Sequence, residues 1–346
     1  MRSQVGDGTA VCAVVKADAY GHGAEACARV FADAGVRWLA VTSPEEGARL
    51  RAAGIDRARI LVLAGFSAAD ADTLIELQLT PAIWDLEHVV WLAAAMERHP
   101  QVERFPVHLK LESGMGRLGV TPAQESAMTA ALRRAPRLQV EALFSHLATA
   151  ETSDDGGSRE QHARFQAARA RLAPEASGHL LNSEGAFRYP QWGEMLVRTG
   201  LALYGYSAQA EPTARLEPAL RWKTRVLAVK DLPAGHGIGY GWQFRAPGPI
   251  RVATIAVGYA DGYRRQLWPG AYVRFDAGPA PVVGNISMDP TTVDVTRLPA
   301  PRVGDEVLLL GPTPGPTAAD LAGWARTIPY EVLCGLSARV ERRYRD

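Results

Sequence analysis

The fold is decided by the stretch Val11-Cys12-Ala13-Val14-Val15-Lys16-Ala17-Asp18-Ala19-Tyr20-Gly21-His22-Gly23. Its first five residues are small or β-branched and apolar, which predicts a strand that is buried on both faces. Lys16 follows at once, and two glycines then open a turn before a helical run over 24–34. A buried strand that leads through a turn into a helix indicates the first unit of an α/β fold with parallel strands.

The lysine at the end of this strand has two interpretations. A lysine amine that is buried without a partner costs free energy unless it is neutral or covalently used. The plainer interpretation is that Lys16 extends its amine from the strand end to solvent. The other is a Schiff-base lysine, whose partly desolvated amine reacts near neutral pH.

Length and composition limit the classes of protein that are possible. The 346 residues are enough for two cores, or for one barrel with an appendage. The 38 basic and 37 acidic residues nearly balance, which disfavours a nucleic-acid partner. No apolar run reaches the ~20 residues of a membrane span, and the first eight residues are too polar for a signal-peptide core. Three cysteines without zinc-ligand spacing predict neither disulfides nor a metal site, so we expect a cytoplasmic protein.

The first 200 residues alternate short apolar runs with longer runs of helical period, such as 44–53 and 122–134. The predicted strands are 10–15, 38–42, 60–63, 80–83, 106–111, 141–146, 179–182 and 195–198. This alternation predicts a closed (β/α)₈ barrel of the TIM type. The alternative is an open doubly wound sheet with a phosphate loop at its switch point. Gly21-x-Gly23 lacks the third glycine of such a loop, which favours the barrel.

The pattern changes near Ala210, where short strands separated by Gly and Pro turns begin. The predicted strands here are 222–229, 250–257, 272–275, 282–283, 292–295 and 306–310, with a short helix at 320–325. Strands at this spacing predict a β-rich domain. We therefore expect a (β/α)₈ barrel over residues 1–212, followed by a mainly β domain over 213–346.

Polar side chains stand at the ends of several predicted barrel strands. They are Lys16, Lys110, His146, Asn182 and Arg198. Each could be structural on its own, and for Asn182 that is as good an interpretation as a functional one. Barrels of this kind carry their chemistry at the carboxyl ends of the strands, so the five together predict one site.

Several motifs in the chain resemble, in order, those of the alanine racemase family. In the first half they are Ala13-Val14-Val15-Lys16-Ala17-Asp18-Ala19-Tyr20-Gly21-His22-Gly23, residues 107–119, Phe144-Ser145-His146 and residues 197–205. In the second half they are Gly239-Tyr240-Gly241, residues 257–263, residues 284–289 and residues 327–332. Basic amino-acid decarboxylases and small pyridoxal-phosphate carrier proteins share the lysine strand but not this second-half set.

The resemblance implies pyridoxal-phosphate-dependent interconversion of L-alanine and D-alanine by two bases, Lys16 and Tyr259. A tyrosine normally ionises near about pH 10, so Tyr259 needs cationic neighbours, for which His146 and Arg198 are the candidates. Two alternatives stay open. One is a racemase that also accepts serine or other small amino acids, and the other is a pyridoxal-phosphate-binding protein without turnover.

The resemblance also implies which residues hold the cofactor. Besides Lys16, they are Tyr20, His146, Asn182, Ser183, Arg198, Gly200, Leu201 and Tyr330. A phosphate group needs backbone N–H donors, and the segments after the last two barrel strands supply them. Arg198 has its own implication. Because an arginine does not give up its proton, it would donate a hydrogen bond to an unprotonated pyridine nitrogen and favour prompt reprotonation of the substrate carbon.

The remaining implied roles concern the substrate and a second subunit. Arg117 would bind the substrate carboxylate, for which a guanidinium is suited. Lys110 would be carboxylated by CO₂ and would hold the nearby arginine. Tyr259 and Met288 would come from the partner subunit of a head-to-tail homodimer with shared active sites. Ser287 and Asn285 depart from the cysteine and arginine frequent in the family, so side-chain preference could shift.

Overall fold

The computed structural model describes residues 1–6, 8–207 and 215–345, which form two compact units. The first unit comprises Met1–Ala19, Gly23–Leu203 and Ser207–Leu216. The second comprises Tyr20–His22, Tyr204–Tyr206 and Glu217–Asp346. The predicted boundary between residues 212 and 213 lies outside the described residues.

The first unit is built on an eight-stranded parallel sheet in the order β7-β6-β5-β4-β3-β2-β1-β8. The strands are β1 (Ala10–Val14), β2 (Trp38–Val41), β3 (Arg59–Val62), β4 (Leu79–Ile83), β5 (Phe105–Lys110), β6 (Leu138–Phe144), β7 (Ser177–His179) and β8 (Leu196–Thr199). Backbone hydrogen bonds from Met195 N–H to the Gly178 carbonyl (3.0 Å) and from Arg198 N–H to the Leu181 carbonyl (2.9 Å) join the two edges. The predicted TIM-type barrel is confirmed, and every predicted strand matches an observed one to within three residues.

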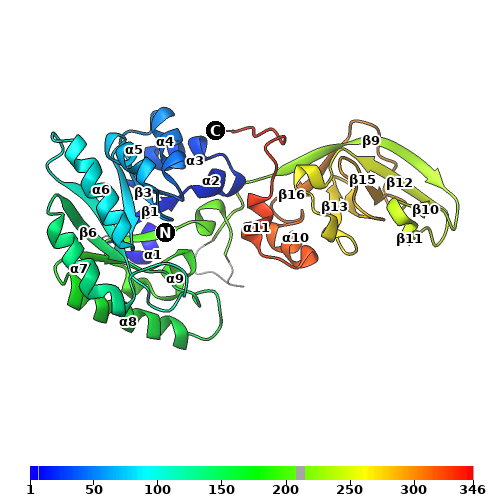
Figure 1. The fold of residues 1–346 in the computed structure, drawn as a ribbon. Coiled ribbons are helices and arrows are strands. Elements are labelled where there is room, and N and C mark those ends of the chain that lie inside the picture. The colour runs from blue at the N-terminus through cyan, green and yellow to red at the C-terminus, as the bar shows by residue number, and fades with distance from the viewer. Residues whose placement is uncertain (7, 208–214, 346) are drawn as a thin grey trace. The chain divides into compact units, whose positions relative to one another are not determined.

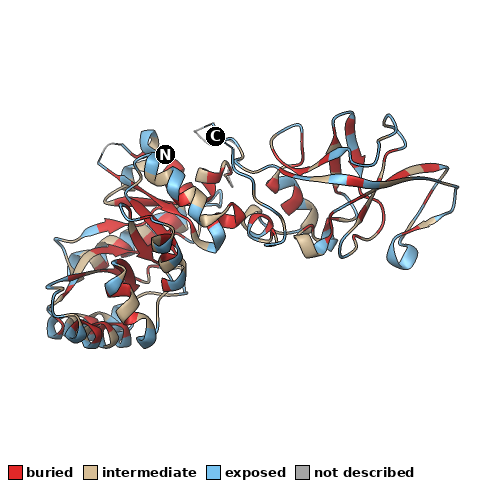
Figure 2. Ribbon diagram, turned by 90° about the horizontal axis from the view of Figure 1, so that it is seen from above, coloured by how far each residue is buried: buried red, intermediate tan, exposed pale blue. Residues whose placement is uncertain are grey.

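Helices lie outside these strands (Figure 1). They are α1 (Arg2–Val5), α3 (Ala24–Asp33), α4 (Pro44–Ala52), α5 (Ala71–Glu76), α6 (Leu86–Arg98), α7 (Glu125–Arg134), α8 (Gly156–Leu172) and α9 (Ser183–Arg188), with 3₁₀ turns η1 (Ala68–Asp70), η2 (Pro122–Gln124), η3 (Pro190–Trp192) and η4 (Leu201–Tyr204). The start of α4 is fixed by its sequence, since Ser43 accepts from the Glu46 N–H and Pro44 occupies the first turn. The strands are buried and the outer helix faces exposed (Figure 2), so the core lies in and around the barrel.

The segment directly after β1 is a left-handed turn of helix, α2 (Lys16–Gly21). Ala17, Asp18, Ala19 and Tyr20 all have φ between 51° and 54°. This conformation costs an L-residue roughly 1–2 kcal/mol, so other contacts have to offset it. The Glu46 carboxylate accepts from Ala17 N–H, and the Asp18 carboxylate accepts from Ala24 N–H, both at 2.8 Å. Strain of this kind is often kept at functional sites, and here it begins beside Lys16.

The second unit carries an antiparallel six-stranded sheet in the order β14-β13-β16-β9-β12-β15. Its strands are β9 (Trp222–Leu232), β12 (Ile250–Ile255), β13 (Tyr272–Phe275), β14 (Gly278–Pro281), β15 (Thr291–Asp294) and β16 (Glu306–Leu310). Around the sheet lie the hairpin β10 (Gly237–Ile238) and β11 (Phe244–Arg245), the turns η5 (Tyr240–Trp242), η6 (Tyr259–Asp261) and η7 (Arg265–Leu267), and helices α10 (Ala318–Ala325) and α11 (Pro329–Cys334). The predicted β-rich second domain is thus confirmed.

One predicted strand of this unit, 282–283, is wrong. Val282 makes only an isolated bridge to Val293, and the strand that pairs with β13 is β14, Gly278–Pro281. Its glycine and two prolines concealed it, because proline is tolerated only in edge strands such as this one. Among residues 1–6, 8–207 and 215–345, no helix has the length and apolar character needed to cross a membrane.

Candidate active site

The polar residues predicted at strand ends lie at or just beyond the carboxyl ends of barrel strands. Lys110 is the last residue of β5, Arg198 lies in β8, and Lys16 and His146 each follow a strand by two residues. Four cations, namely Lys16, Lys110, Arg117 and Arg198, lie close enough to His146 to affect its ionisation. The first unit therefore gathers positive charge at this end of the barrel.

His146 is neutral in this setting. Desolvation and the four neighbouring cations lower the pKa of His146 to about 3. Its Nδ1 lies 3.4 Å from Nη2 of Arg198, and its backbone carbonyl accepts from the Gln161 amide at 2.9 Å. Of the two cationic neighbours predicted for Tyr259, His146 therefore carries no charge at neutral pH, and Arg198 does.

Arg198 is buried, and desolvation lowers its pKa to about 10, so it stays charged at neutral pH. Nη1 donates to Nδ1 and to the carbonyl of His179, at 2.6 and 2.9 Å. Nη2 donates to the carbonyls of Ser145 and Leu180, at 2.6 and 3.1 Å. No residue in the described ranges accepts from the remaining Nε–H. The guanidinium is held rigidly with one donor left for a ligand.

A chain of hydrogen bonds continues from Arg198 through the barrel. Nε2 of His179 lies 2.9 Å from Nδ1 of His108, and Nε2 of His108 lies 3.4 Å from Glu141, which also pairs with Arg59. Because desolvation lowers the pKa of both histidines, each is neutral. His179 accepts from Arg198 at Nδ1, so it donates from Nε2 to His108, which in turn donates to Glu141. All the donors point the same way, from the arginine to the carboxylate.

The far end of this chain is anionic. Burial opposes ionisation of Glu141, but hydrogen bonds from His108 and Arg59 prevail and lower its pKa to about 2. Arg59 is the first residue of β3, and β3 and β6 are separated by two strands in the sheet. The contact between Arg59 and Glu141 therefore crosses the barrel interior. This series of hydrogen bonds connects the amino end of the barrel with the site at its carboxyl end.

Sequence reasoning missed His179, His108 and Glu141. A signal existed for His108, which lies two residues before Lys110 on the same strand and so shares its face. No such signal existed for Glu141, because it sits in a β-bulge. The register passes from Val107↔Val140 to His108↔Ala142, and the residue skipped on β6 is Glu141. Bulges redirect side chains in this way.

The segments after β7 and β8 meet at Ser183. Its buried hydroxyl accepts from the N–H groups of Gly200 (3.0 Å) and Ala202 (3.4 Å). The side chain of Asn182 accepts from Gly185 N–H at 2.8 Å and is the N-cap of α9. Leu201 is buried next to Gly200. The structure thus brings together three of the residues predicted to bind phosphate, and gives Asn182 a capping role.

Lys110 is buried at the end of β5, with its Nζ 5.5 Å from the ring centre of Trp84 and 5.6 Å from that of Phe144. Desolvation and the cations Arg117, Arg198 and Lys16 lower its pKa to about 8. Roughly a tenth of the amine is therefore uncharged at pH 7.

Arg117 is exposed on the loop that follows β5. The Glu112 carboxylate shapes this loop by accepting from the N–H groups of Gly114 (2.5 Å), Gly116 (2.9 Å) and Arg117 (3.2 Å). The loop then returns to the strand, where Val120 N–H donates to the Lys110 carbonyl at 2.8 Å. This closed loop keeps Arg117 in the neighbourhood of Lys110.

The second unit holds the other predicted site residues in two groups. The ring of Tyr20 lies 5.8 Å from that of Tyr330 and 5.2 Å from that of Tyr204, between centroids. Tyr259 begins η6, where its N–H donates to the Ser287 carbonyl at 3.0 Å, and Ala260 N–H donates to that of Met288 at 3.0 Å. Tyr259 and Met288 are 44% and 53% exposed.

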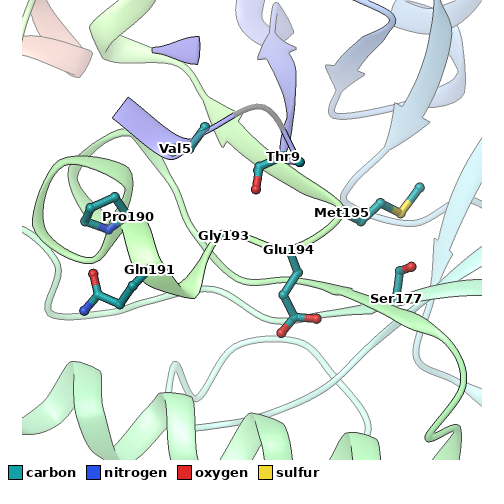
Figure 3. Close-up of a pocket in the computed structure, with 9 residues that line it drawn as sticks. Val5, Thr9, Ser177, Pro190, Gln191, Gly193, Glu194 and Met195 are labelled. Atoms are coloured by element: carbon teal, nitrogen blue, oxygen red, sulfur yellow. The ribbon is translucent and has the colours of Figure 1, made fainter. Parts of the chain in front are cut away.

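A pocket at the other end of the barrel is not part of this site (Figure 3). It is lined by Thr9, Ser177 and Met195, which stand at the amino ends of β1, β7 and β8, and by Glu194, which pairs with Arg169. None of its lining residues is a predicted site residue, and the chemistry of such barrels belongs to the carboxyl ends.

Comparisons with known proteins agree with this arrangement over the whole chain. Residues 1–208 match the family model of the alanine racemase N-terminal domain, and residues 219–344 match that of the C-terminal domain. An alanine racemase of Symbiobacterium thermophilum is 43% identical over 343 residues, covering 96% of this chain and 89% of the relative.

Two solved structures are similar as well. The alanine racemase of Streptomyces coelicolor superposes with a TM-score of 0.92 at 33% identity, covering 98% of this chain and 92% of that one. The alanine racemase of Bartonella henselae with covalently bound pyridoxal phosphate has a TM-score of 0.92 at 30% identity, covering 99% and 94%. The chain therefore belongs to the alanine racemase family.

Proposed function

We propose that this chain is an enzyme that interconverts L-alanine and D-alanine with pyridoxal phosphate as its cofactor. The observation that carries the proposal is Arg198, a buried guanidinium fixed by His179, Ser145 and Leu180 with its Nε–H left to donate. A fixed donor of this kind suits the unprotonated nitrogen of a pyridine ring, since arginine keeps its proton. Membership of the alanine racemase family supports the choice of reaction and substrate.

The described residues fit this cofactor. Four cations around a neutral histidine suit the anionic groups of a cofactor and an amino-acid substrate, and the buried Ser183 hydroxyl beside the Gly200 N–H group suits a phosphate ester. Lys16 would hold the cofactor covalently, and Arg198 would face the ring nitrogen. The remaining cofactor contacts would be His146 and Asn182 beside the ring, and Ser183, Gly200, Leu201, Tyr20 and Tyr330 around the phosphate. Pyridoxal phosphate, when bound, supplies the electron sink that acidifies the Cα–H bond of an amino acid.

The chain's own residues then have to move a proton on and off each face of Cα. Lys16, released when the substrate amine takes its place, would serve the D-alanine side. The partner's Tyr259 would serve the L-alanine side in a head-to-tail homodimer, with the partner's Met288 beside it. Both side chains are about half exposed in the single chain, and exposed apolar surface of this kind is typical of an interface.

Arg117 would bind the substrate carboxylate, and Lys110 would hold Arg117 in place. The pKa of Lys110, lowered to about 8, leaves amine free to add CO₂, which gives a carbamate and releases a proton. The same cations that lower this pKa would stabilise the carbamate anion. A carbamate on Lys110 would hold Arg117, whose guanidinium is suited to bidentate binding of a carboxylate.

The proposal is tested with the purified protein and pyridoxal phosphate. We expect an absorbance band in the near-visible, borohydride reduction that fixes the cofactor on Lys16 by peptide mass, and exchange of the alanine Cα–H with deuterated solvent. Lys16→Ala should lose the band and at least about 10⁴-fold in rate, because it removes both the covalent link and one base.

Two results would count against the proposal. Cofactor bound at Lys16 without Cα–H exchange would indicate a binding protein without turnover. Faster exchange with serine than with alanine would indicate a racemase of broader specificity. Lys223→Ala serves as the control, since this lysine lies in the second unit and pairs with Glu306 on the sheet.

A further inference from the structure

Arg339 joins two turns of the second unit. Its Nε lies 2.6 Å from Asp261 and its Nη2 lies 2.7 Å from Asp289. Asp261 ends the 3₁₀ turn η6, which begins at Tyr259, and Asp289 directly follows Met288. A single guanidinium from the C-terminal segment therefore holds the two turns that carry Tyr259 and Met288.

The Tyr259 turn is tied to the C-terminal segment in further ways. The second carboxylate oxygen of Asp261 accepts from Gly258 N–H at 2.8 Å, which closes the turn on itself. The Asp261 carbonyl accepts from Ser337 N–H at 3.0 Å. At Gly262, with φ of +101°, a Cβ would lie 2.3 Å from the Gly335 carbonyl oxygen, so the two backbones are in direct contact.

The two turns also touch each other through their backbones. The N–H groups of Tyr259 and Ala260 donate to the carbonyls of Ser287 and Met288. These bonds join the backbones of the two turns but involve neither the Asp261 nor the Asp289 side chain. Arg339 adds a side-chain link between Asp261 and Asp289, and its planar fork engages the two carboxylates in fixed directions, whereas a lysine ammonium is a compact charge on a flexible stem.

We propose that Arg339 is a positioning residue, which fixes the direction in which the Tyr259 phenol projects by clamping Asp261 to Asp289. The inference rests on the proposed function for the role of Tyr259 as a base. Arg339 itself is half exposed, and such ion pairs contribute little to stability. Its effect is on orientation, to which proton transfer is sensitive because small displacements of a reacting group lower the rate steeply.

The test compares Arg339→Gln and Arg339→Lys with the control Arg343→Gln in the holoenzyme. Arg343 lies in the same C-terminal segment and pairs with Glu341, so the control removes an exposed ion pair that touches neither turn. Hydrogen–deuterium exchange of peptides covering residues 257–263 and 285–290 measures the turns without reference to activity. Kinetic isotope effects with L-alanine and D-alanine deuterated at Cα measure which proton transfer has slowed.

The isotope effects are needed because the equilibrium constant of racemisation is one, so kcat/KM falls equally in both directions. With Arg339→Gln we expect faster exchange in both peptides, kcat lowered about 10- to 100-fold, and a larger isotope effect for L-alanine but not for D-alanine. Arg339→Lys should give intermediate values, and Arg343→Gln should match the unsubstituted enzyme.

Unchanged exchange in both peptides, or isotope effects that rise equally for the two enantiomers, would overturn the inference. Faster exchange throughout residues 222–310 would also overturn it, because it would indicate a general loss of stability. Tyr259→Phe separates this failure from that of the proposed function. If Tyr259→Phe racemises alanine at the full rate, the role of the tyrosine is wrong, whatever the exchange data say of the clamp.

Discussion

The cation cluster in the first unit and the Tyr259 turn in the second are organised by different physical means. In the cluster, Arg198 is buried and His146 is neutral, and charge is controlled by desolvation. In the turn, Tyr259 is 44% exposed, and its position is set by backbone hydrogen bonds and the Arg339 ion pairs. The charges of the first region are set within one unit, whereas the second region leaves the side chain of Tyr259 partly exposed.

The two regions are therefore sensitive to different kinds of substitution. A buried hydrogen-bonded network responds to any loss of a donor or acceptor, because the group left behind cannot turn to water. An exposed turn tolerates such a loss energetically, and its sensitivity lies in geometry. Substitutions in the cluster should therefore change both stability and activity, and substitutions in the turn should change activity alone.

The strongest test of this contrast is Tyr259→Phe. We expect a loss of about 10³-fold in kcat, since general acid–base catalysis contributes 10²–10⁴-fold, while the near-visible cofactor band and the free energy of unfolding stay unchanged. Racemisation measured by circular dichroism, together with urea unfolding, provides the check. Tyr344→Phe, at another exposed tyrosine of the second unit, is the matched control. A large drop in the free energy of unfolding would show that the Tyr259 hydroxyl also stabilises the fold, contrary to the contrast drawn above.

The fold was predictable to a large degree, and the reason is visible in the barrel strands. Parallel strands are buried on both faces, so they appear as continuous apolar runs such as residues 11–15. The failures lie where this signal is weak. Strand β14 contains a glycine and two prolines, and α11 is only six residues long. The left-handed α2 could not be foreseen. Of its four residues with positive φ, only Asp18 is of a type that favours this conformation, and the other three are alanine or tyrosine.

The candidate site was predictable for residues at strand ends, but not for those that support them. Lys110, Arg198 and His146 follow from the rule that barrel chemistry lies at carboxyl ends. The neutral state of His146 depends on how many cations surround it, which needs coordinates. Glu141 reaches His108 because a bulge in β6 changes the register, and no residue pattern encodes that bulge.

The supporting chain through the barrel gives the second test. His108→Phe removes the acceptor for the Nε2–H of His179, and leaving that buried donor unpaired should cost about 1–3 kcal/mol of unfolding free energy. His179 could then carry its proton on Nδ1 instead and oppose the Nη1–H of Arg198. We expect kcat to fall about tenfold, equivalent to about 1.4 kcal/mol, with a shifted cofactor band.

His108→Gln is the matched variant, because its amide oxygen can still accept from His179. It should recover most of the stability and activity, and its cofactor band should return toward that of the unsubstituted enzyme. If the two variants behave alike, the proton arrangement assigned to the chain is wrong, and His108 only fills space in the barrel.

The last test concerns stability in acid. The pKa of His146 is about 3 in the folded state against 6.5 for a free histidine, and burial also lowers the pKa of His108 and His179. Well above pH 6.5 neither state binds these protons, so the full stability is present. As the pH falls from 6.5 toward 3, the unfolded chain binds protons that the folded chain does not, and the free energy of unfolding falls by up to about 1.4 kcal/mol per pH unit for each histidine.

Urea unfolding at pH 7.5, 6.5 and 5.5 measures this slope. His146→Asn should make the slope shallower, because His146 is kept neutral by desolvation and four cations, and His236→Asn, at an exposed histidine of the second unit, is the control. If the unsubstituted protein and both variants show the same slope, His146 does not cause the loss of stability in acid, and it takes up a proton in the folded state more readily than its burial implies.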